Sequence, residues 1–123
     1  MNREILYRGK RVDNGEWTYG FYFEHSIDGQ KQSYIKYQTF DEGFITNEVD
    51  VNTVGQYTGI KDDKDVKIFE GDIVESPHGT QGVVEWQNAE CAFLVNIGDD
   101  WQTMDDCPYT VISNIYDNAE MNE

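Results

Sequence analysis

Four aspartates surround a tryptophan near the end of this 123-residue chain. Asp99, Asp100, Asp105 and Asp106 flank Trp101 in the stretch GDDWQTMDD. Carboxylate oxygens are the ligands that Ca²⁺ and Mg²⁺ prefer, but the spacing does not fit an EF-hand loop. We therefore expect a solvated hairpin loop with the tryptophan tucked inward. An alternative is a recognition surface, in which an aromatic anchor is surrounded by steering charge.

Two histidines and two cysteines are the other candidates for metal binding or nucleophilic chemistry. No pair among His25, His78, Cys91 and Cys107 has the short spacing of structural zinc sites. A nucleophilic thiol needs a base and an electropositive setting, but an acidic residue precedes each cysteine. The sequence also lacks a P-loop, a Gly-x-Gly-x-x-Gly and a Gly-x-Ser-x-Gly motif. We expect no catalytic residue, metal ion or cofactor, and the protein is not predicted to be an enzyme.

Charge is distributed unevenly along the chain, whose net charge is −15. Residues 1–67 hold all 9 basic residues against 12 acidic ones, whereas residues 68–123 hold 12 acidic residues and no basic one. Nucleic-acid binding needs cationic groups that displace counterions from phosphates, so we expect no direct contact with DNA or RNA. A solvated acidic surface is the simplest interpretation. The alternative is a surface that imitates phosphate charge.

A length of 123 residues indicates one domain, or two small subdomains that share a core. No apolar run approaches the roughly 20 residues that cross a bilayer, and the chain does not open with a secretory leader pattern. Two cysteines are too few for a disulfide framework. We therefore expect a cytoplasmic protein with reduced thiols and no membrane association.

Four aromatic residues alternate along one predicted strand. They share one face of the stretch EWTYGFYFEH and are Trp17, Tyr19, Phe21 and Phe23. Because each aromatic side chain buries about 150–250 Å² in a core, we expect this face to be the buried one. The preceding Asn14-Gly15 pair supplies the positive φ angles of a tight turn, so residues 5–12 and 16–25 are predicted to form a hairpin.

Residues typical of turns recur through the middle of the chain. Asp28-Gly29 predicts a second turn before the strand SYIKYQTF. Asp50 is the predicted N-cap of one helical turn that extends to residue 54. Gly59 is assigned to a further structural turn, and residues 61–65 to a solvated hairpin tip.

Short strands separated by glycine turns dominate the second half and predict a small β-barrel. Gly71 would allow a sharp entry into the strand DIVES, and Asp72 would bind backbone amides at that corner. In the pairs Ile73-Val74 and Val83-Val84, one residue should point inward. The predicted fold is mainly β with little helix. It combines an N-terminal β-hairpin region (1–49) with an SH3-like barrel region (50–119) in a single domain.

Three blocks of this sequence resemble the YopX family of phage and prophage proteins. The blocks are Arg8-Gly9-Lys10 with Gly15-Glu16-Trp17, GQYTG at 55–59, and FEGDIV at 69–74. The resemblance covers roughly residues 1–119. It departs from the family pattern at Ser113, where Gly is usual, and at Ala119, where Pro is usual. It implies an SH3-type barrel core, an origin in a bacteriophage or prophage and hence the cytoplasm of a bacterium, but no established activity and no catalytic residues.

Three functions are compatible with these features. The first is a non-enzymatic interaction or assembly module that binds a host protein, a phage protein or itself, with exposed tyrosines such as Tyr22, Tyr34 and Tyr37 forming a second apolar face. The second is an acidic decoy, a DNA mimic that inhibits a host nucleic-acid-binding protein. The third is a metal-dependent enzyme that uses the Asp99–Asp106 cluster.

Overall fold

The computed structural model describes residues 4–104 and 108–117, and these are mainly β-strand, as the sequence predicts. The chain divides into two compact units, Met1–Gln56 and Tyr57–Glu123. The division falls inside a strand and later in the chain than the boundary expected after residue 49. Among the described residues, helix is confined to single short turns.

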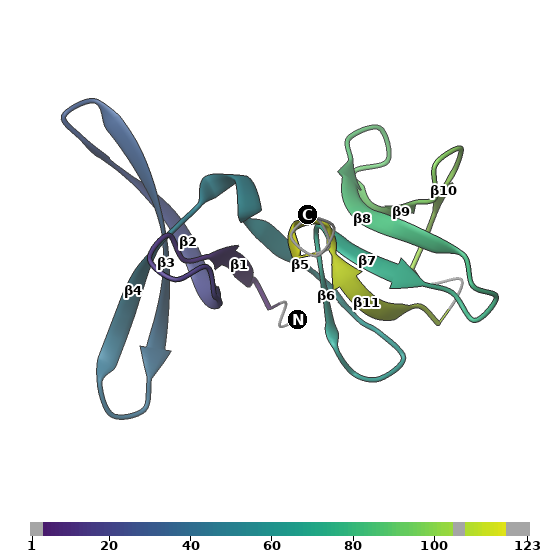
Figure 1. Ribbon diagram of the computed structural model, residues 1–123, viewed down its shortest axis with the longest axis horizontal. Helices are drawn as coiled ribbons and strands as arrows, with labels where there is room; N and C mark the ends of the chain where they lie inside the picture. Colours follow the sequence, from purple (N-terminus) through teal and green to yellow (C-terminus); the bar gives the residue numbers. More distant parts are fainter. Residues whose placement is uncertain (1–3, 105–107, 118–123) are drawn as a thin grey trace. The chain divides into compact units, whose positions relative to one another are not determined.

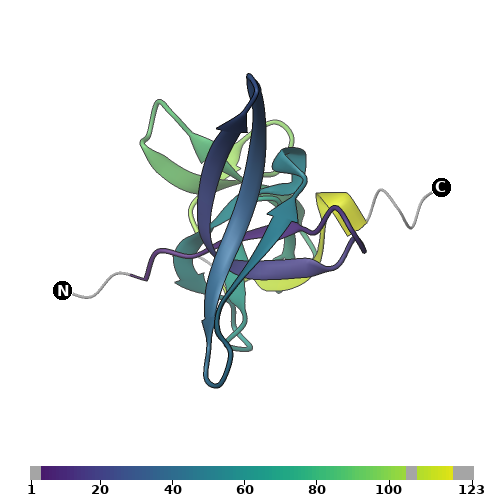
Figure 2. The ribbon, with the colours of Figure 1, turned by 90° about the vertical axis from the view of Figure 1, so that its left-hand side faces the viewer.

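The first unit is built from four antiparallel strands, each paired with the next along the chain. They are β1 (Tyr7–Lys10), β2 (Trp17–Ile27), β3 (Gln30–Thr39) and β4 (Gly43–Val49). The predicted first hairpin is confirmed, with Tyr7 opposite Gly20 and Lys10 opposite Trp17. Figures 1 and 2 show β3 as a long strand with the β2–β3 and β3–β4 turns at its opposite ends.

The two predicted turns of this unit differ in type. Asp28 and Gly29 both have positive φ (53° and 80°), and Ile27 pairs with Gln30, so the β2–β3 connection is a two-residue turn. At the first hairpin only Gly15 has positive φ (74°). There the N–H of Arg11 donates to the carbonyl of Glu16, which encloses a four-residue loop instead of the tight turn expected at Asn14-Gly15. The Asn14 side chain holds that loop by accepting the Glu16 N–H at 2.9 Å.

The burial of β2 is the reverse of the expected one. Tyr19, Phe21 and Phe23 are 45%, 65% and 39% exposed, whereas Thr18 and Gly20 on the opposite face are buried. The reason is the close approach of backbones on the small-residue face: a Cβ added at Gly20 would lie 2.3 Å from the Lys36 carbonyl oxygen. At Gly20 this side has no room for a side chain, whereas Tyr19, Phe21 and Phe23 lie on the other side of the strand.

A single 3₁₀ turn, η1 (Val51–Thr53), follows β4. Asp50 is its N-cap, as predicted, and its carboxylate accepts the N–H of Asn52 at 3.0 Å. Buried Thr53 then accepts the backbone N–H of Lys10 at 2.8 Å, which joins this turn to β1.

The second unit contains a five-stranded antiparallel sheet in the order β10-β9-β8-β7-β11. Its strands are β7 (Asp72–Glu75), β8 (Gln81–Gln87), β9 (Ala92–Asn96), β10 (Trp101–Gln102) and β11 (Thr110–Asn114). Strands β7 to β10 form a meander, and the fifth strand, β11, pairs with β7 at the other edge of the sheet. No ladder joins β10 to β11 among the described strands, so the predicted small β fold is present but its barrel is not closed.

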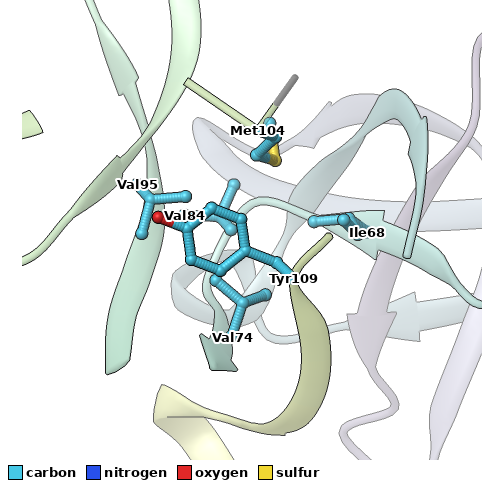
Figure 3. Packing of buried hydrophobic residues seen from close by; sticks show 6 residues of the cluster. All are labelled: Ile68, Val74, Val84, Val95, Met104 and Tyr109. Carbon is cyan, nitrogen blue, oxygen red and sulfur yellow. The ribbon is translucent and has the colours of Figure 1, made fainter. Parts of the chain in front are cut away.

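The core of this unit gathers around Tyr109 (Figure 3). The ring is 2% exposed and contacts side chains from several strands and loops. The buried cluster consists of Ile68, Val74, Val84, Val95, Met104 and Tyr109. Val74 and Val84 are fully buried while the residue before each is half-buried, which confirms that one residue of each pair points inward.

Candidate functional site

The acidic loop that the sequence singles out connects β9 to β10. Asp99 and Asp100 are exposed, and the Asp100 carboxylate accepts the backbone N–H of Trp101 at 2.8 Å. Trp101 starts β10 opposite Asn96 and is 37% exposed, so its ring is not tucked inward as expected. Asp105 and Asp106, the other two members of the cluster, lie outside the described residues.

The remaining candidate metal ligands and nucleophiles are dispersed. His25, His78 and Cys91 are all exposed, and Cys107 lies outside the described residues. Within residues 4–104 and 108–117, no three His, Cys, Asp or Glu side chains come together in a group that could hold an ion. The part of the chain that the structure describes thus assembles no metal-binding constellation from these residue types.

The charged turn at residues 61–65 connects β5 (Gly55–Lys61) to β6 (Lys67–Phe69) and binds β11. One Asp62 oxygen accepts the N–H groups of Lys64 and Val66, each at 2.8 Å, and the other accepts the N–H of Val111 at 3.0 Å. Thr110 donates to Asp63 at 2.8 Å. The predicted hairpin tip is present and most of its residues are exposed, but two of its carboxylates also bind β11, which the sequence did not indicate.

The Glu70-Gly71-Asp72 stretch forms the corner between β6 and β7. Asp72 is 1% exposed, and its carboxylate accepts the N–H of Phe69 at 2.7 Å. Gly71 has a φ of 93°, and a Cβ added there would lie 3.1 Å from the Tyr116 ring. Backbone geometry and packing therefore account for the presence of Gly71 and Asp72 at this corner.

Gly59 lies inside β5 and not in a turn between strands. Its φ of 88° falls where the register with β6 shifts, between Tyr57 and Lys61. A glycine with positive φ in a strand typically marks such an irregularity.

The surface that sequence reasoning missed is the exposed side of the β2–β3–β4 sheet. Directly opposed residues of an antiparallel pair share a face, and the register therefore assigns the rings of β2 to the same side as Tyr34 of β3 and Phe44 of β4. We call this side the aromatic face; its rings are Trp17, Tyr19, Phe21, Phe23, Tyr34 and Phe44. The alternation in β2 showed that these rings share a side, but it could not show that this side faces solvent.

Cations lie over two rings of the aromatic face. The Arg8 guanidinium is 4.5 Å from the Trp17 ring centroid, and the Lys36 ammonium is 4.7 Å from that of Phe44. Phe23 and Tyr34 stack with their centroids 5.3 Å apart. Such contacts hold the rings in defined positions, which reduces the entropy lost when a partner binds.

The three tyrosines expected to form a second apolar face do not lie on one side. Tyr34 belongs to the aromatic face, whereas Tyr22 pairs with Ile35 on the opposite, buried side. The Tyr22 hydroxyl donates to Glu24 at 2.7 Å and lies 3.1 Å from the Ser33 hydroxyl. Tyr37 pairs with Ile45, also on the side opposite Tyr34.

These features define a small antiparallel β protein in two units, with a solvent-facing aromatic sheet surface. The chain belongs to the YopX protein family, whose sequence model matches residues 6–123. A search of curated proteins found no match. None of the described helical segments has the length and apolar character required to cross a membrane.

Proposed function

We propose that this YopX family member is a non-enzymatic interaction module encoded by a phage or prophage and active in the bacterial cytoplasm. The observation that carries the proposal is the exposure of Phe21, Phe23 and Phe44 on one sheet face. Large aromatic side chains are enriched in the centres of protein interfaces and depleted from ordinary surfaces.

The charge of the face supports a protein partner over a nucleic acid. Arg8 and Lys10 are buried, so among the described residues Lys36, which is half-buried, is the most accessible of the cations that contact these rings. One lysine neutralises few phosphates, and the chain as a whole carries −15. The aromatic face is therefore a poor electrostatic match for DNA or RNA.

The structural use of three acidic residues weakens the DNA-mimic alternative. Asp62, Asp63 and Asp72 accept hydrogen bonds that hold turns and strands together, whereas a DNA mimic needs carboxylates that remain available on one surface. For the metal-enzyme alternative, Asp99 and Asp100 belong to no group of three His, Cys, Asp or Glu side chains among the described residues that could hold an ion.

Capture experiments with two matched variants test the proposal. The tagged chain and its Phe21→Ser/Phe44→Ser variant are used as baits in the native bacterial host during phage growth. Phe40→Ser is the control, since Phe40 is a fully exposed aromatic residue in the β3–β4 turn, outside the face. We expect a partner that is retained by the wild type and the control and lost by the double variant. Equal capture by all three baits would contradict this assignment of the surface.

A further inference from the structure

We propose that the aromatic face binds the same face of a second copy of this chain, forming a two-fold symmetric dimer. This inference rests on the proposed function and names its partner. The face is continuous, because Lys36 lies opposite Phe21 in the register and its ammonium covers the Phe44 ring, while Tyr34 lies opposite Phe23 and stacks on it.

The exposed aromatic area matches the scale of a dimer interface. Tyr19, Phe21, Phe23 and Phe44 are between 39% and 65% exposed. At about 150–250 Å² per ring this amounts to roughly 400 Å² of aromatic surface. A stable interface takes about 800 Å² from each partner. The exposed aromatic side chains alone would therefore supply about half of the area that one partner contributes to a stable interface.

Charge favours a second copy at this face. Two chains of −15 repel each other over most of their surfaces. On the β3 and β4 part of the aromatic face the charged side chains are Lys36 and the exposed Glu48, which lies opposite Tyr34, while the buried Arg8 and Lys10 lie over Trp17 at the β1 edge. The charges of Lys36 and Glu48 sum to zero, and a two-fold axis lets each lysine approach the glutamate of the other copy, since in such an interface every contact occurs twice.

The projecting end of the β2–β3 hairpin is a further reason to expect a dimer through this face. β4 pairs with β3 only from Ser33 to Thr39, and β1 pairs with β2 only up to Gly20. Among the described strands, residues 25–27 and 30–32 therefore form a two-stranded ribbon, with Ile27 exposed along it and Phe23 exposed just before it. Two-stranded ribbons are marginally stable alone in water, and a second copy packed on this side would cover these apolar side chains.

Sedimentation equilibrium and light scattering over a range of protein concentrations test the dimer. We expect reversible dimerisation that Phe21→Ser/Phe44→Ser weakens about tenfold or more. The Phe40→Ser control should leave it unchanged. Added NaCl should strengthen association or leave it constant, because salt screens the repulsion between acidic chains. Circular dichroism confirms that each variant is folded.

Charge reversal provides a test that does not remove a ring. Lys36→Glu and Glu48→Lys should each weaken dimerisation, and the double exchange should restore it, because it re-creates the opposite pairing across the two-fold axis. If the aromatic double variant fails to fold, this series still decides the question.

Four results would overturn the proposal. The first is that the protein stays monomeric at every concentration, and the second is that it forms a dimer whose stability none of these substitutions changes. The third is an association that is abolished by salt or by Asp99→Asn/Asp100→Asn. The fourth is that the monomer binds a single-stranded oligonucleotide in fluorescence anisotropy. A monomer that captures another protein through the aromatic face would refute the dimer and leave the proposed function standing. A monomer that captures nothing through it would refute both.

Discussion

The carboxylate of Asp62 accepts the backbone N–H of Val111 at 3.0 Å, across 49 residues of the chain. This contact joins the β5–β6 turn to the last strand of the five-stranded sheet. Asp62 also accepts the N–H groups of Lys64 and Val66, so one side chain both shapes its own turn and fixes a distant strand. A turn that looks solvated in the sequence is thus part of the tertiary structure.

Replacement of Asp62 should destabilise the protein more than replacement of a neighbouring acid. Asp62→Ala leaves the half-buried N–H of Val111 without its carboxylate acceptor, and hydrogen bonds to charged groups contribute about 1.5–3 kcal/mol. We expect a loss of about 2 kcal/mol in the free energy of unfolding, measured by urea denaturation. Asp65→Asn is the control, because it removes only an exposed ion pair with Lys61. Equal losses would contradict the role of Asp62.

The contribution of Asp62 should depend on pH. Burial raises the pKa of this carboxyl, but the N–H groups of Val111, Val66 and Lys64 outweigh burial, so the pKa lies below its ordinary value. A carboxyl with a lowered pKa stabilises the folded state above its unfolded value of about 3.9, and this stabilisation is lost as the pH falls through the folded value. The stability difference between the wild type and Asp62→Asn should therefore shrink below about pH 4. Thermal unfolding of both proteins at several pH values measures it, and a constant difference would refute the assignment.

Gly71 and Gly79 form a matched pair for testing the corner before β7. Both have φ near 90°, but a Cβ at Gly71 meets the Tyr116 ring at 3.1 Å, whereas a Cβ at Gly79 meets no heavy atom within 4 Å. Gly79→Ala should cost about 1–2 kcal/mol from backbone strain alone. Gly71→Ala should cost about 1–3 kcal/mol more, because of the added crowding. Chemical denaturation of the two variants measures the difference, and equal costs would show that Tyr116 does not restrict this position.

The reversed burial of β2 predicts different losses of stability for substitutions on the two sides of this sheet. Ile35 is fully buried, so Ile35→Ala should cost about 2–5 kcal/mol. Phe21→Ala should cost less than about 1 kcal/mol in dilute protein, because the ring is 65% exposed. Urea denaturation at the lowest usable concentration separates this effect from dimerisation. A loss of several kcal/mol for Phe21→Ala would indicate that the aromatic face is buried within a single chain.

Several local features followed directly from the residues. Asp28-Gly29 specifies a two-residue turn because both positions tolerate positive φ. Asp50 caps η1 because its carboxylate reaches an N–H two residues ahead. The mainly β class and the family were also predictable, since period-two alternation and short blocks such as FEGDIV lie within a few residues of one another.

Burial and long-range contacts were decided by the tertiary structure. Alternation in β2 determines which aromatic residues share a side, but Gly20 and the backbone at Lys36 decide which side is closed. The Asp62–Val111 contact likewise depends on a strand 49 residues away. The sequence by itself determined most of the strands, several turns and which aromatic residues of β2 share a side. Only the packing of distant segments placed that side in solvent, because exposure depends on what approaches a strand and not on the strand alone.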